Sequence, residues 1–277
     1  MAEPDALLAL ARAIGANARA AYGVGLGLVL LVTAATWATV HHPVWARARE
    51  RAGEHISESM GLVARGGIGL AVIVVAAALF AEIAEHIGPD GRIARADDLL
   101  AATLRADLST GTLQLFATFT RAGDVAVLTA LGVGVALALW LGGRRLLAVG
   151  WVMAVGGNAL LNPLLKGIFE RVRPVHDHGF ATETSWSFPS GHSSGAMVAY
   201  GMLAYLAVRL LHPKWHLPAL LLAAGVIFTT GCSRILLQVH FASDVAAGFA
   251  SGLAWLTVCV SSLEWRGRRD WQTVQHR

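Results

Sequence analysis

The sequence predicts an all-α integral membrane protein with a core of six transmembrane helices and one additional N-terminal hydrophobic helix. Of its 277 residues, 55% are hydrophobic and only 14% are charged, and the mean hydropathy is +0.56. Apolar runs recur along the chain at about the 20-residue length that a helix needs to cross a bilayer. Short basic loops separate these runs. An ordinary soluble domain is excluded by this composition.

The N-terminal part, residues 1–66, is predicted to precede the core. Residues 1–20 set apolar side chains against basic ones: Leu7, Leu8, Leu10 and Ile14 against Arg12 and Arg19. This pattern is typical of an amphipathic helix that lies at a membrane interface. The extra hydrophobic helix is expected at 21–40. It is followed at 41–66 by alternating Arg and Glu residues, which predict a solvated cytoplasmic connection.

The core is predicted to occupy residues 67–263. A helix break at Pro89-Asp90-Gly91 and a polar, amphipathic connection over 92–121 follow its first span. The connection is expected to lie along the outer surface. A basic cytoplasmic tail is expected at 264–277. The predicted core spans are 67–87, 124–141, 146–165, 193–211, 217–235 and 245–263.

The distribution of positive charge orients this topology. Threading the spans in order places twelve Lys/Arg on one face, in the segments 41–66, 142–145, 209–216 and 264–277. The other face holds six, apart from the motif residues discussed below. Because cytoplasmic loops carry the excess of Lys and Arg, the first face is predicted to be cytoplasmic. The chain is therefore expected to be a multi-pass cell-membrane protein.

Several other classes of function are disfavoured. The net charge is +4 and the pI is near 9.6, but most of the surplus arginine lies in loops between spans, so no nucleic-acid partner is expected. Cys232 and Cys259 fall in or beside different apolar segments without metal-ligand spacing, and they are predicted to be packing residues. His41-His42 lacks a third ligand nearby. No metal site is therefore predicted. The glycines lie inside apolar spans, where they permit close helix packing, so no cofactor is predicted either.

Three short runs concentrate the ionisable residues at the ends of apolar segments. They are Lys166-Gly-Ile-Phe-Glu-Arg-Val-Arg173-Pro174, Phe188-Pro-Ser-Gly-His192 and Ser233-Arg-Ile-Leu-Leu-Gln-Val-His-Phe-Ala-Ser-Asp244. Ionisable groups next to membrane spans are costly, so their default interpretation is functional. All three runs fall on the predicted extracytoplasmic face.

The residue types in these runs suit phosphoryl transfer. Lys166, Arg173 and Arg234 offer fixed positive charge to the phosphate oxygens. Lys166 and Arg173 are seven residues apart, so the helix is expected to end between them and let them converge. Ser190 is a natural N-cap, and Gly191 lets the backbone approach an anion at a helix start.

The two histidines can supply the remaining chemistry. His192 is expected on the first turn of a helix, beside the bound phosphate. His240 and Asp244 are four residues apart, which predicts that they share a helix face and that the carboxylate fixes the imidazole tautomer. The other ring nitrogen of His240 is then free to attack phosphorus. The loop 175–187 also carries His176, Asp177, His178 and Glu183, which are expected to be solvated.

As a set, the patterns Lys-x6-Arg-Pro, Pro-Ser-Gly-His and Ser-Arg-x5-His-x3-Asp resemble those of the type 2 phosphatidic acid phosphatases. This family of lipid phosphate phosphatases shares its site with vanadium-dependent haloperoxidases. The resemblance covers roughly residues 67–263. It implies a six-helix core and metal-independent hydrolysis through a phosphohistidine. Residues 1–66 depart from the family pattern, and their extra span is expected to serve dimerisation or substrate access, which leaves a homo-oligomer open.

The resemblance also implies roles for the matching residues. His240 would be the nucleophile, Asp244 its orienting carboxylate and His192 the acid for the leaving group, while the phosphate would be held by Lys166, Arg173, Arg234 and the Ser190-Gly191 backbone. The expected substrate is a lipid phosphate monoester or diphosphate: polyprenyl diphosphate, phosphatidic acid or phosphatidylglycerophosphate. The alternatives are a lipid phosphotransferase with the same site and a non-enzymatic lipid-binding or transport protein.

Overall fold

The computed structural model describes residues 6–42, 58–88, 91–175, 179–181 and 183–275. Its helices are α1 (Ala6–Ala16), α2 (Ala18–Val40), α4 (Glu58–His86), α5 (Arg92–Asp107), α6 (Thr110–Phe119), η1 (Thr120–Gly123), α7 (Val125–Leu141), α8 (Arg145–Phe169), α9 (Gly191–Leu210), η2 (Pro213–Trp215), α10 (His216–Leu236) and α11 (Ala242–Gln275). The described residues contain no strand. The prediction of an all-α fold is therefore confirmed.

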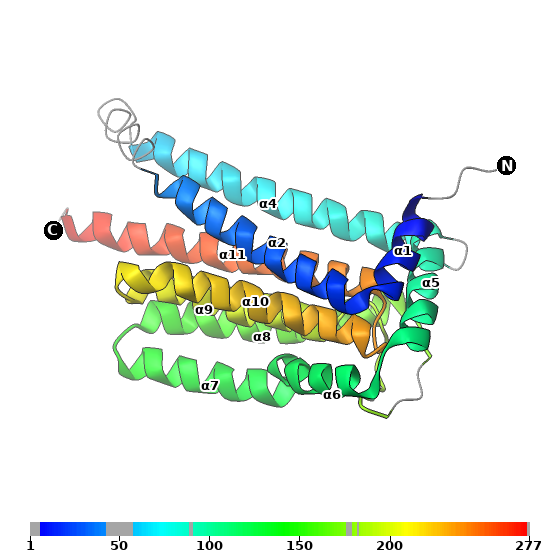
Figure 1. The fold of residues 1–277 in the computed structure, drawn as a ribbon. Helices are drawn as coiled ribbons and strands as arrows, with labels where there is room; N and C mark the ends of the chain where they lie inside the picture. The colour runs from blue at the N-terminus through cyan, green and yellow to red at the C-terminus, as the bar shows by residue number, and fades with distance from the viewer. Residues whose placement is uncertain (1–5, 43–57, 89–90, 176–178, 182, 276–277) are drawn as a thin grey trace.

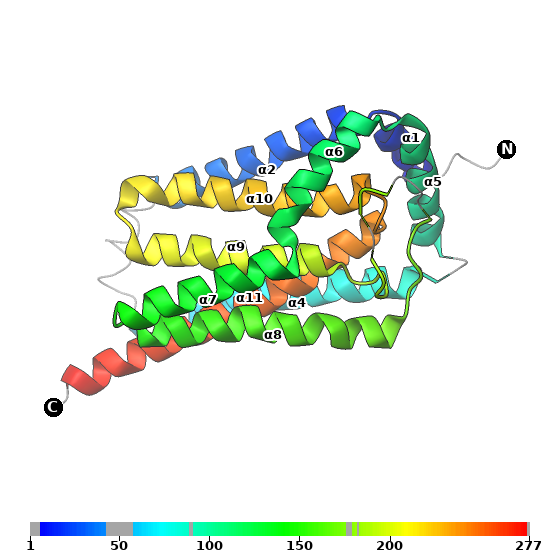
Figure 2. The same ribbon diagram turned by 90° about the horizontal axis from the view of Figure 1, so that it is seen from below.

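The long helices run side by side as one bundle, while α1 and α5 cross its end (Figures 1 and 2). Each predicted span corresponds to one of these helices, with small differences at the ends. α4 begins at Glu58, before the predicted start of its span, and α11 continues through the basic tail to Gln275. The predicted connection over 92–121 consists of α5, α6 and η1.

Six stretches of the described chain are long and apolar enough to cross a membrane. They comprise α2, Gly66–His86 of α4, α6 together with α7, α8, η2 with α10, and Ala242–Arg266 of α11. The chain is a multi-pass membrane protein, as predicted.

The central helix α9 is not one of these six stretches. It packs against α8, α10 and α11, and no residue from Gly191 to Ala207 is exposed. Because its neighbours cover this part of the helix, Ser193 and Ser194 can lie in its buried first turns.

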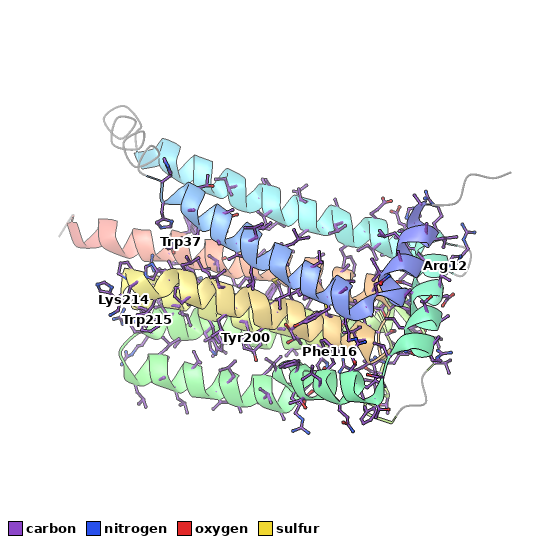
Figure 3. The ribbon with its side chains drawn as sticks, in the orientation of Figure 1. Arg12, Trp37, Phe116, Tyr200, Lys214 and Trp215 are labelled. Carbon is purple, nitrogen blue, oxygen red and sulfur yellow. The ribbon has the colours of Figure 1, made fainter. Side chains whose placement is uncertain are left out.

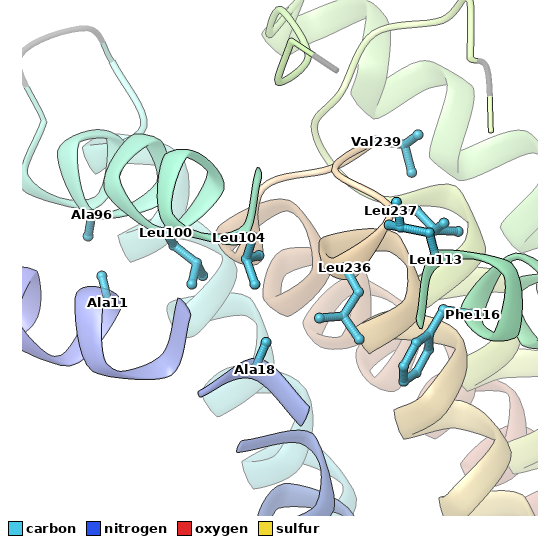
Figure 4. Close-up of a cluster of buried hydrophobic side chains, with 10 residues drawn as sticks. All are labelled: Ala11, Ala18, Ala96, Leu100, Leu104, Leu113, Phe116, Leu236, Leu237 and Val239. Atoms are coloured by element: carbon cyan, nitrogen blue, oxygen red, sulfur yellow. The ribbon is translucent and has the colours of Figure 1, made fainter. Parts of the chain in front are cut away.

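An apolar cluster attaches the crossing helices to the bundle (Figure 4). Ala11 of α1 and Leu100 of α5 belong to it, together with Leu113 and Phe116 of α6 and Leu236 at the end of α10. The contact of α1 with α5 is tight, because a Cβ added at Gly15 would lie 2.6 Å from Thr103 Cβ. The short amphipathic helix predicted at the N-terminus therefore exists and packs on α5.

The additional hydrophobic helix α2 lies on the outside of the bundle, along α10. Tyr22 hydroxyl and Thr229 Oγ1 are 2.9 Å apart, and a Cβ added at Gly25 would lie 2.6 Å from Phe228 Cζ. Most of its other residues are exposed. This placement fits a helix added to the rim of a bundle that is complete without it.

The end of the bundle opposite α1 and α5 carries aromatic and basic side chains. Trp37, Lys214 and Trp215 lie at that end, whereas Arg12 lies at the other (Figure 3). Tryptophan and lysine are frequent at membrane–water boundaries. The α9–α10 turn and the α7–α8 turn, which the sequence predicts to be cytoplasmic, also lie at that end.

Candidate active site

A cavity of about 440 Å³ lies where the three motif runs meet, at the α1–α5 end of the bundle. Its polar wall includes Lys166, Arg173, Glu183, Ser185, His192 and His240. Its apolar wall comes from α7, α8 and α9 and includes Val125, Leu128, Val155, Ala159, Pro163 and Val198. The cavity therefore joins a cationic site to an apolar surface within the helix bundle.

Lys166 and Arg173 converge on the same loop, as predicted. Lys166 occupies the last turn of α8, which ends at Phe169 with Glu170 in the left-handed region at φ 45°. Ser185 Oγ accepts from Lys166 Nζ at 3.4 Å and from Arg173 Nη2 at 3.1 Å. Both cations also donate to the carbonyl of Trp186. The loop thus holds two positive charges together at the cavity.

Arg234 is buried behind this pair, at the end of α10. Its Nη1 donates to Thr120 Oγ1 at 2.8 Å, and its Nη2 donates to Glu183. Its Nε is a buried donor without a partner among the described residues. Buried donors are normally paired, so this atom is an unused hydrogen-bonding position beside the cavity.

Glu183 lies among the cationic groups of the site. Besides its bond with Arg234, its carboxylate is 3.9 Å from Arg173 Nη2 and 3.9 Å from His192 Nδ1. The expectation that Glu183 is solvated was wrong, because the cations gathered by the fold bind its carboxylate. The expectations for His176, Asp177 and His178 lie outside the described residues.

His240 and Asp244 are in contact, although they do not share a helix face. α11 begins only at Ala242, so His240 lies in the preceding turn and the carboxylate reaches back from the first turn of the helix. The predicted shared face was therefore wrong. His240 Nδ1 is 3.5 Å from Asp244 Oδ2, which also accepts from Ser187 Oγ at 2.5 Å and from Phe241 N at 2.9 Å.

The second nitrogen of His240 faces the cations. Its Nε2 is 3.1 Å from Arg173 Nη1. Because a guanidinium can only donate, Nε2 is the acceptor in this contact and the ring proton lies on Nδ1. Burial lowers the pKa of His240 to about 3, against the opposing effect of Asp244. The ring is therefore neutral near pH 7, with the Nε2 lone pair directed to the cavity.

The start of α9 brings its own groups to the site. Ser190 is the N-cap, as predicted: its Oγ accepts from Ser193 N at 3.4 Å. Its N–H donates to the Asp244 carbonyl at 2.9 Å, so the Ser190 main chain fixes α9 against α11. At Gly191 a Cβ would lie 2.9 Å from Asn162 Oδ1, which explains the glycine at this close approach of α8 and α9.

His192 follows in the first turn of α9. Its Nε2 lies 3.0 Å from Asp124 Oδ1, and its Nδ1 is directed to the side of the cavity that holds Glu183. One ring nitrogen is thus bound by a carboxylate and the other faces the cationic site. This arrangement suits a group that exchanges a proton with a ligand in the cavity.

Sequence reasoning missed four charged or polar groups that support the predicted site: Asp97, Asp124, Arg171 and Ser187. Asp124 binds His192, Ser187 binds Asp244, and Arg171 binds both Asp244 and Asp97. Arg171 stands inside the first motif run, and Asp124 immediately precedes a predicted span, so both carried a positional signal. Asp97 gave only a weak signal, a carboxylate on the apolar face of an amphipathic helix.

The described residues also contain a group of potential metal ligands outside the cavity. Side-chain ligand atoms of Glu82, Glu85 and His86, on the last turns of α4, lie within 4.8 Å of one another. None of them lines the cavity described above. The cavity instead collects cationic side chains, which suit an anion.

Comparisons with known proteins find similar sequences. Residues 145–268 match the model of the PAP2 superfamily. The chain is 42% identical over 109 residues to phosphatidylglycerophosphatase B of Bacillus subtilis (strain 168), covering 37% of this chain and 51% of that protein. It is 34% identical over 128 residues to a lipid A 1-phosphatase of Rhizobium etli, covering 40% of this chain and 50% of that one. The chain thus spans about half the length of the curated relatives it matches.

A solved structure shares the fold over a longer stretch. It is the crystal structure of a transmembrane PAP2-type phosphatidylglycerolphosphate phosphatase from Bacillus subtilis. The TM-score is 0.64 at 29% identity, and the match covers 69% of this chain and 96% of that one.

Proposed function

We propose that the chain, whose residues 145–268 match the model of the PAP2 superfamily, is a membrane lipid phosphatase that acts through a phosphohistidine. The observation that carries the proposal is the position of His240 Nε2. It is an unprotonated ring nitrogen at a cavity that also holds Lys166, Arg173 and His192. A neutral nucleophile next to fixed positive charge is what phosphoryl transfer requires.

The phosphate group is proposed to bind between Lys166, Arg173 and Arg234, with the Gly191 backbone as a further donor. Arg234 Nε then gains the partner that it lacks among the described residues. The Glu183 carboxylate occupies part of this position, and the phosphate displaces it from Arg234. The positive groups stabilise the charge that the phosphoryl oxygens carry in the transition state.

In the first step, His240 Nε2 attacks phosphorus and forms a P–N bond. Burial lowers the pKa of His192 to about 4, so the proton that it donates is one that it takes up together with the phosphate anion. The P–O bond to the lipid breaks, and His192 gives this proton to the departing oxygen. Asp244 holds the Nδ1–H of His240 throughout, so the positive charge that develops on the ring lies beside a carboxylate. The products of this step are the dephosphorylated lipid and the phosphohistidine.

In the second step, water attacks the phosphorus while His192 takes one of its protons. The P–N bond breaks, and inorganic phosphate leaves with His240 neutral again. His192 thereby regains the proton that it lost in the first step. Both steps use side chains alone, so we propose that the reaction is independent of metal ions.

The apolar wall of the cavity supports a lipid as the substrate. Val125 and Leu128 of α7 and Ala159 of α8 line the same cavity as the cations. A phosphorylated headgroup at His240 can therefore keep its hydrocarbon portion against apolar side chains. Polyprenyl diphosphate, phosphatidic acid and phosphatidylglycerophosphate all satisfy this requirement. With the basic loops in the cytoplasm, the site faces the extracytoplasmic side.

The test is phosphate release by the purified protein in detergent from these three lipids, with and without EDTA. The wild type is expected to release phosphate in EDTA, and His240→Gln to lose at least about 10³-fold in kcat, as loss of a covalent nucleophile does. His216→Gln, at the opposite end of the bundle, is the matched control and should keep wild-type activity.

A brief reaction with phosphate-labelled lipid should also leave an acid-labile label on the protein. Turnover by folded His240→Gln would remove the covalent mechanism. Loss of activity in EDTA with recovery in Mg²⁺ would contradict the role given to the cations. If the protein becomes labelled but loses the label only when an alcohol acceptor is added, it is a phosphotransferase instead.

A further inference from the structure

Arg171 joins two buried carboxylates behind the active site. Its Nη1 donates to Asp244 Oδ1 at 2.6 Å, and its Nη2 donates to Asp97 Oδ2 at 2.9 Å. Asp244 is fully buried and Asp97 nearly so. A planar guanidinium is suited to this task because its fork can bind two carboxylates in fixed directions at once.

Ser243 closes the network. Its Oγ accepts from Arg171 Nη1 at 2.7 Å, its N–H donates to Asp97 Oδ1 at 3.2 Å, and its hydroxyl donates to Asp97. The guanidinium carbon also lies 4.3 Å from the ring centroid of Phe241. Arg171 is thus fixed from α5, from the first turn of α11 and from the residue that follows His240.

The two oxygens of Asp244 have separate partners. Arg171 binds Oδ1, whereas Ser187, the Phe241 N–H and His240 all contact Oδ2. Arg171 therefore sets the rotation of the carboxylate that directs Oδ2 to the imidazole. Without Arg171, the buried Oδ1 atom would lose this donor, and the carboxylate could turn away from His240.

We propose that Arg171, held by Asp97, is a positioning residue for His240, acting through Asp244. Both terminal nitrogens of Arg171 are taken up by Asp244, Ser243 and Asp97, so it acts on the carboxylate and not on the phosphate. This inference rests on the proposed phosphatase function. It extends the catalytic unit from the motif residues to α5, the helix on which the N-terminal α1 packs.

The test compares Arg171→Gln, Arg171→Lys and Asp97→Asn with two exposed controls on α5, Asp98→Asn and Arg95→Gln. In Arg171→Gln we expect kcat to fall by roughly 10²-fold, the effect of a 1 Å misplacement of a reacting group. KM should stay within about threefold, because the phosphate-binding side chains are intact. Arg171→Lys should recover part of the loss. Both controls should match the wild type.

A second readout follows His240 directly. In protein labelled with ¹⁵N-histidine, the His240 ring, assigned by difference with His240→Gln, should show the Nδ1–H tautomer in the wild type. Arg171→Gln should show a mixture of tautomers, because the Nδ1–H loses its fixed acceptor and only the Arg173 contact to Nε2 still favours that form. A role in stability alone would lower the Tm and leave the tautomer and the kcat of the folded fraction unchanged. That result would overturn the proposal, as would wild-type kcat in folded Arg171→Gln.

Two further comparisons keep the test decisive. If Arg171→Gln does not fold, Arg171→Lys decides, because wild-type kcat and tautomer in that variant would exclude positioning by the guanidinium fork. The Asp97→Asn/Arg171→Gln double variant balances the charge without restoring the contact to Asp244. It should remain slow, and full recovery would show that only the charge balance matters.

The experiments distinguish failure of the proposed phosphatase function from failure of the proposed role of Arg171. If the wild type releases no phosphate from any lipid, the phosphatase proposal fails. The tautomer and the binding of orthovanadate, a phosphate analogue, still report on the positioning of His240. A loss of both in Arg171→Gln would support positioning, and their retention would exclude it.

Discussion

Asp124 Oδ1 lies 3.0 Å from His192 Nε2, so the second histidine of the site has a carboxylate partner of its own. Asp124 immediately precedes α7 and is distant in sequence from Asp244, the carboxylate that contacts His240. If His192 protonates the leaving oxygen from Nδ1, Asp124 stabilises the ring while it carries the proton. Asp124→Asn should therefore lower kcat on a lipid phosphate by roughly 10- to 100-fold, as expected for weakened acid catalysis.

The leaving group provides the specific check on Asp124. An alkyl-chain aryl phosphate with an acidic leaving group needs little protonation, so Asp124→Asn should be nearly as active on it as the wild type. Asp98→Asn, an exposed carboxylate on α5, is the control and should leave both substrates unaffected. An equal loss on both substrates would exclude a role for Asp124 in proton transfer.

In the proposed mechanism, Glu183 competes with phosphate for the same cations. Its carboxylate binds Arg234 and lies 3.9 Å from Arg173 Nη2. In Glu183→Gln the competing charge is gone, and we expect inorganic phosphate to inhibit at concentrations roughly 5- to 10-fold lower, equivalent to about 1 kcal/mol of binding. The measurement is the inhibition constant of phosphate at fixed lipid concentration. An unchanged or weaker inhibition would show that Glu183 does not occupy the phosphate position.

The buried His240 predicts how stability depends on pH. Its folded pKa is about 3, whereas the ordinary value is about 6.5. Between these pH values the unfolded chain binds a proton that the folded chain does not, so this residue makes the free energy of unfolding fall as the pH drops below about 6.5. The loss is at most about 1.4 kcal/mol per pH unit.

His240→Gln cannot bind this proton, so the difference in thermal stability between wild type and variant should change between pH 7 and pH 4. The Tm of the wild type is expected to fall further than that of the variant over that range. Parallel Tm curves for the two proteins would show that His240 titrates alike in the folded and unfolded states.

The close contact of α9 with α11 predicts a sensitive glycine. A Cβ at Gly248 would lie 2.6 Å from the Ser190 carbonyl oxygen and 2.9 Å from Ser193 Cβ. Gly248→Ala should therefore destabilise the protein by about 1–3 kcal/mol, the range for overpacking, and displace the start of α9. Gly156→Ala is the matched control, because a Cβ there meets nothing within 4 Å. Thermal unfolding in detergent and kcat of both variants check this, and equal Tm values would refute it.

The predicted orientation in the membrane can be measured with single cysteines. Val172 is exposed near the site, and Lys214 is exposed at the opposite end of the bundle. In a background without Cys232 and Cys259, Val172→Cys should react with a membrane-impermeant maleimide in intact spheroplasts, whereas Lys214→Cys should react only after lysis. The reverse pattern would place the site in the cytoplasm.

Much of the fold was predictable because a bilayer restricts what a chain can do. The apolar runs had to be helices, and the basic loops after residues 141 and 211 indicated that these ends of the helices lie on the same side. Even α9, whose polar first turns weaken its hydropathy, was recognisable by its Ser190 cap. What hydropathy could not show is how α1 and α5 pack, since their amphipathic pattern fits a lipid surface as well as a protein surface.

The site was predictable to the extent that its chemistry is encoded in short motifs. Lys166 and Arg173 meet as expected because α8 ends between them. The partners of the supporting carboxylates were not predictable, because Asp97 and Asp124 are distant in sequence from the groups they bind. Glu183 was misjudged for a related reason: a loop glutamate is usually solvated, and only the three-dimensional gathering of cations changes its surroundings.

The central position of α9 has a mechanical consequence for an enzyme in a fluid bilayer. Lipids press on the outer helices, and changes in bilayer thickness tilt those helices first. His192 and the Ser190 cap belong to a helix that other helices shield along most of its length. The proposed acid and the cap of the proposed phosphate site therefore lie away from the lipids, while α7 and α8, which carry the apolar wall, have residues exposed on the outside of the bundle.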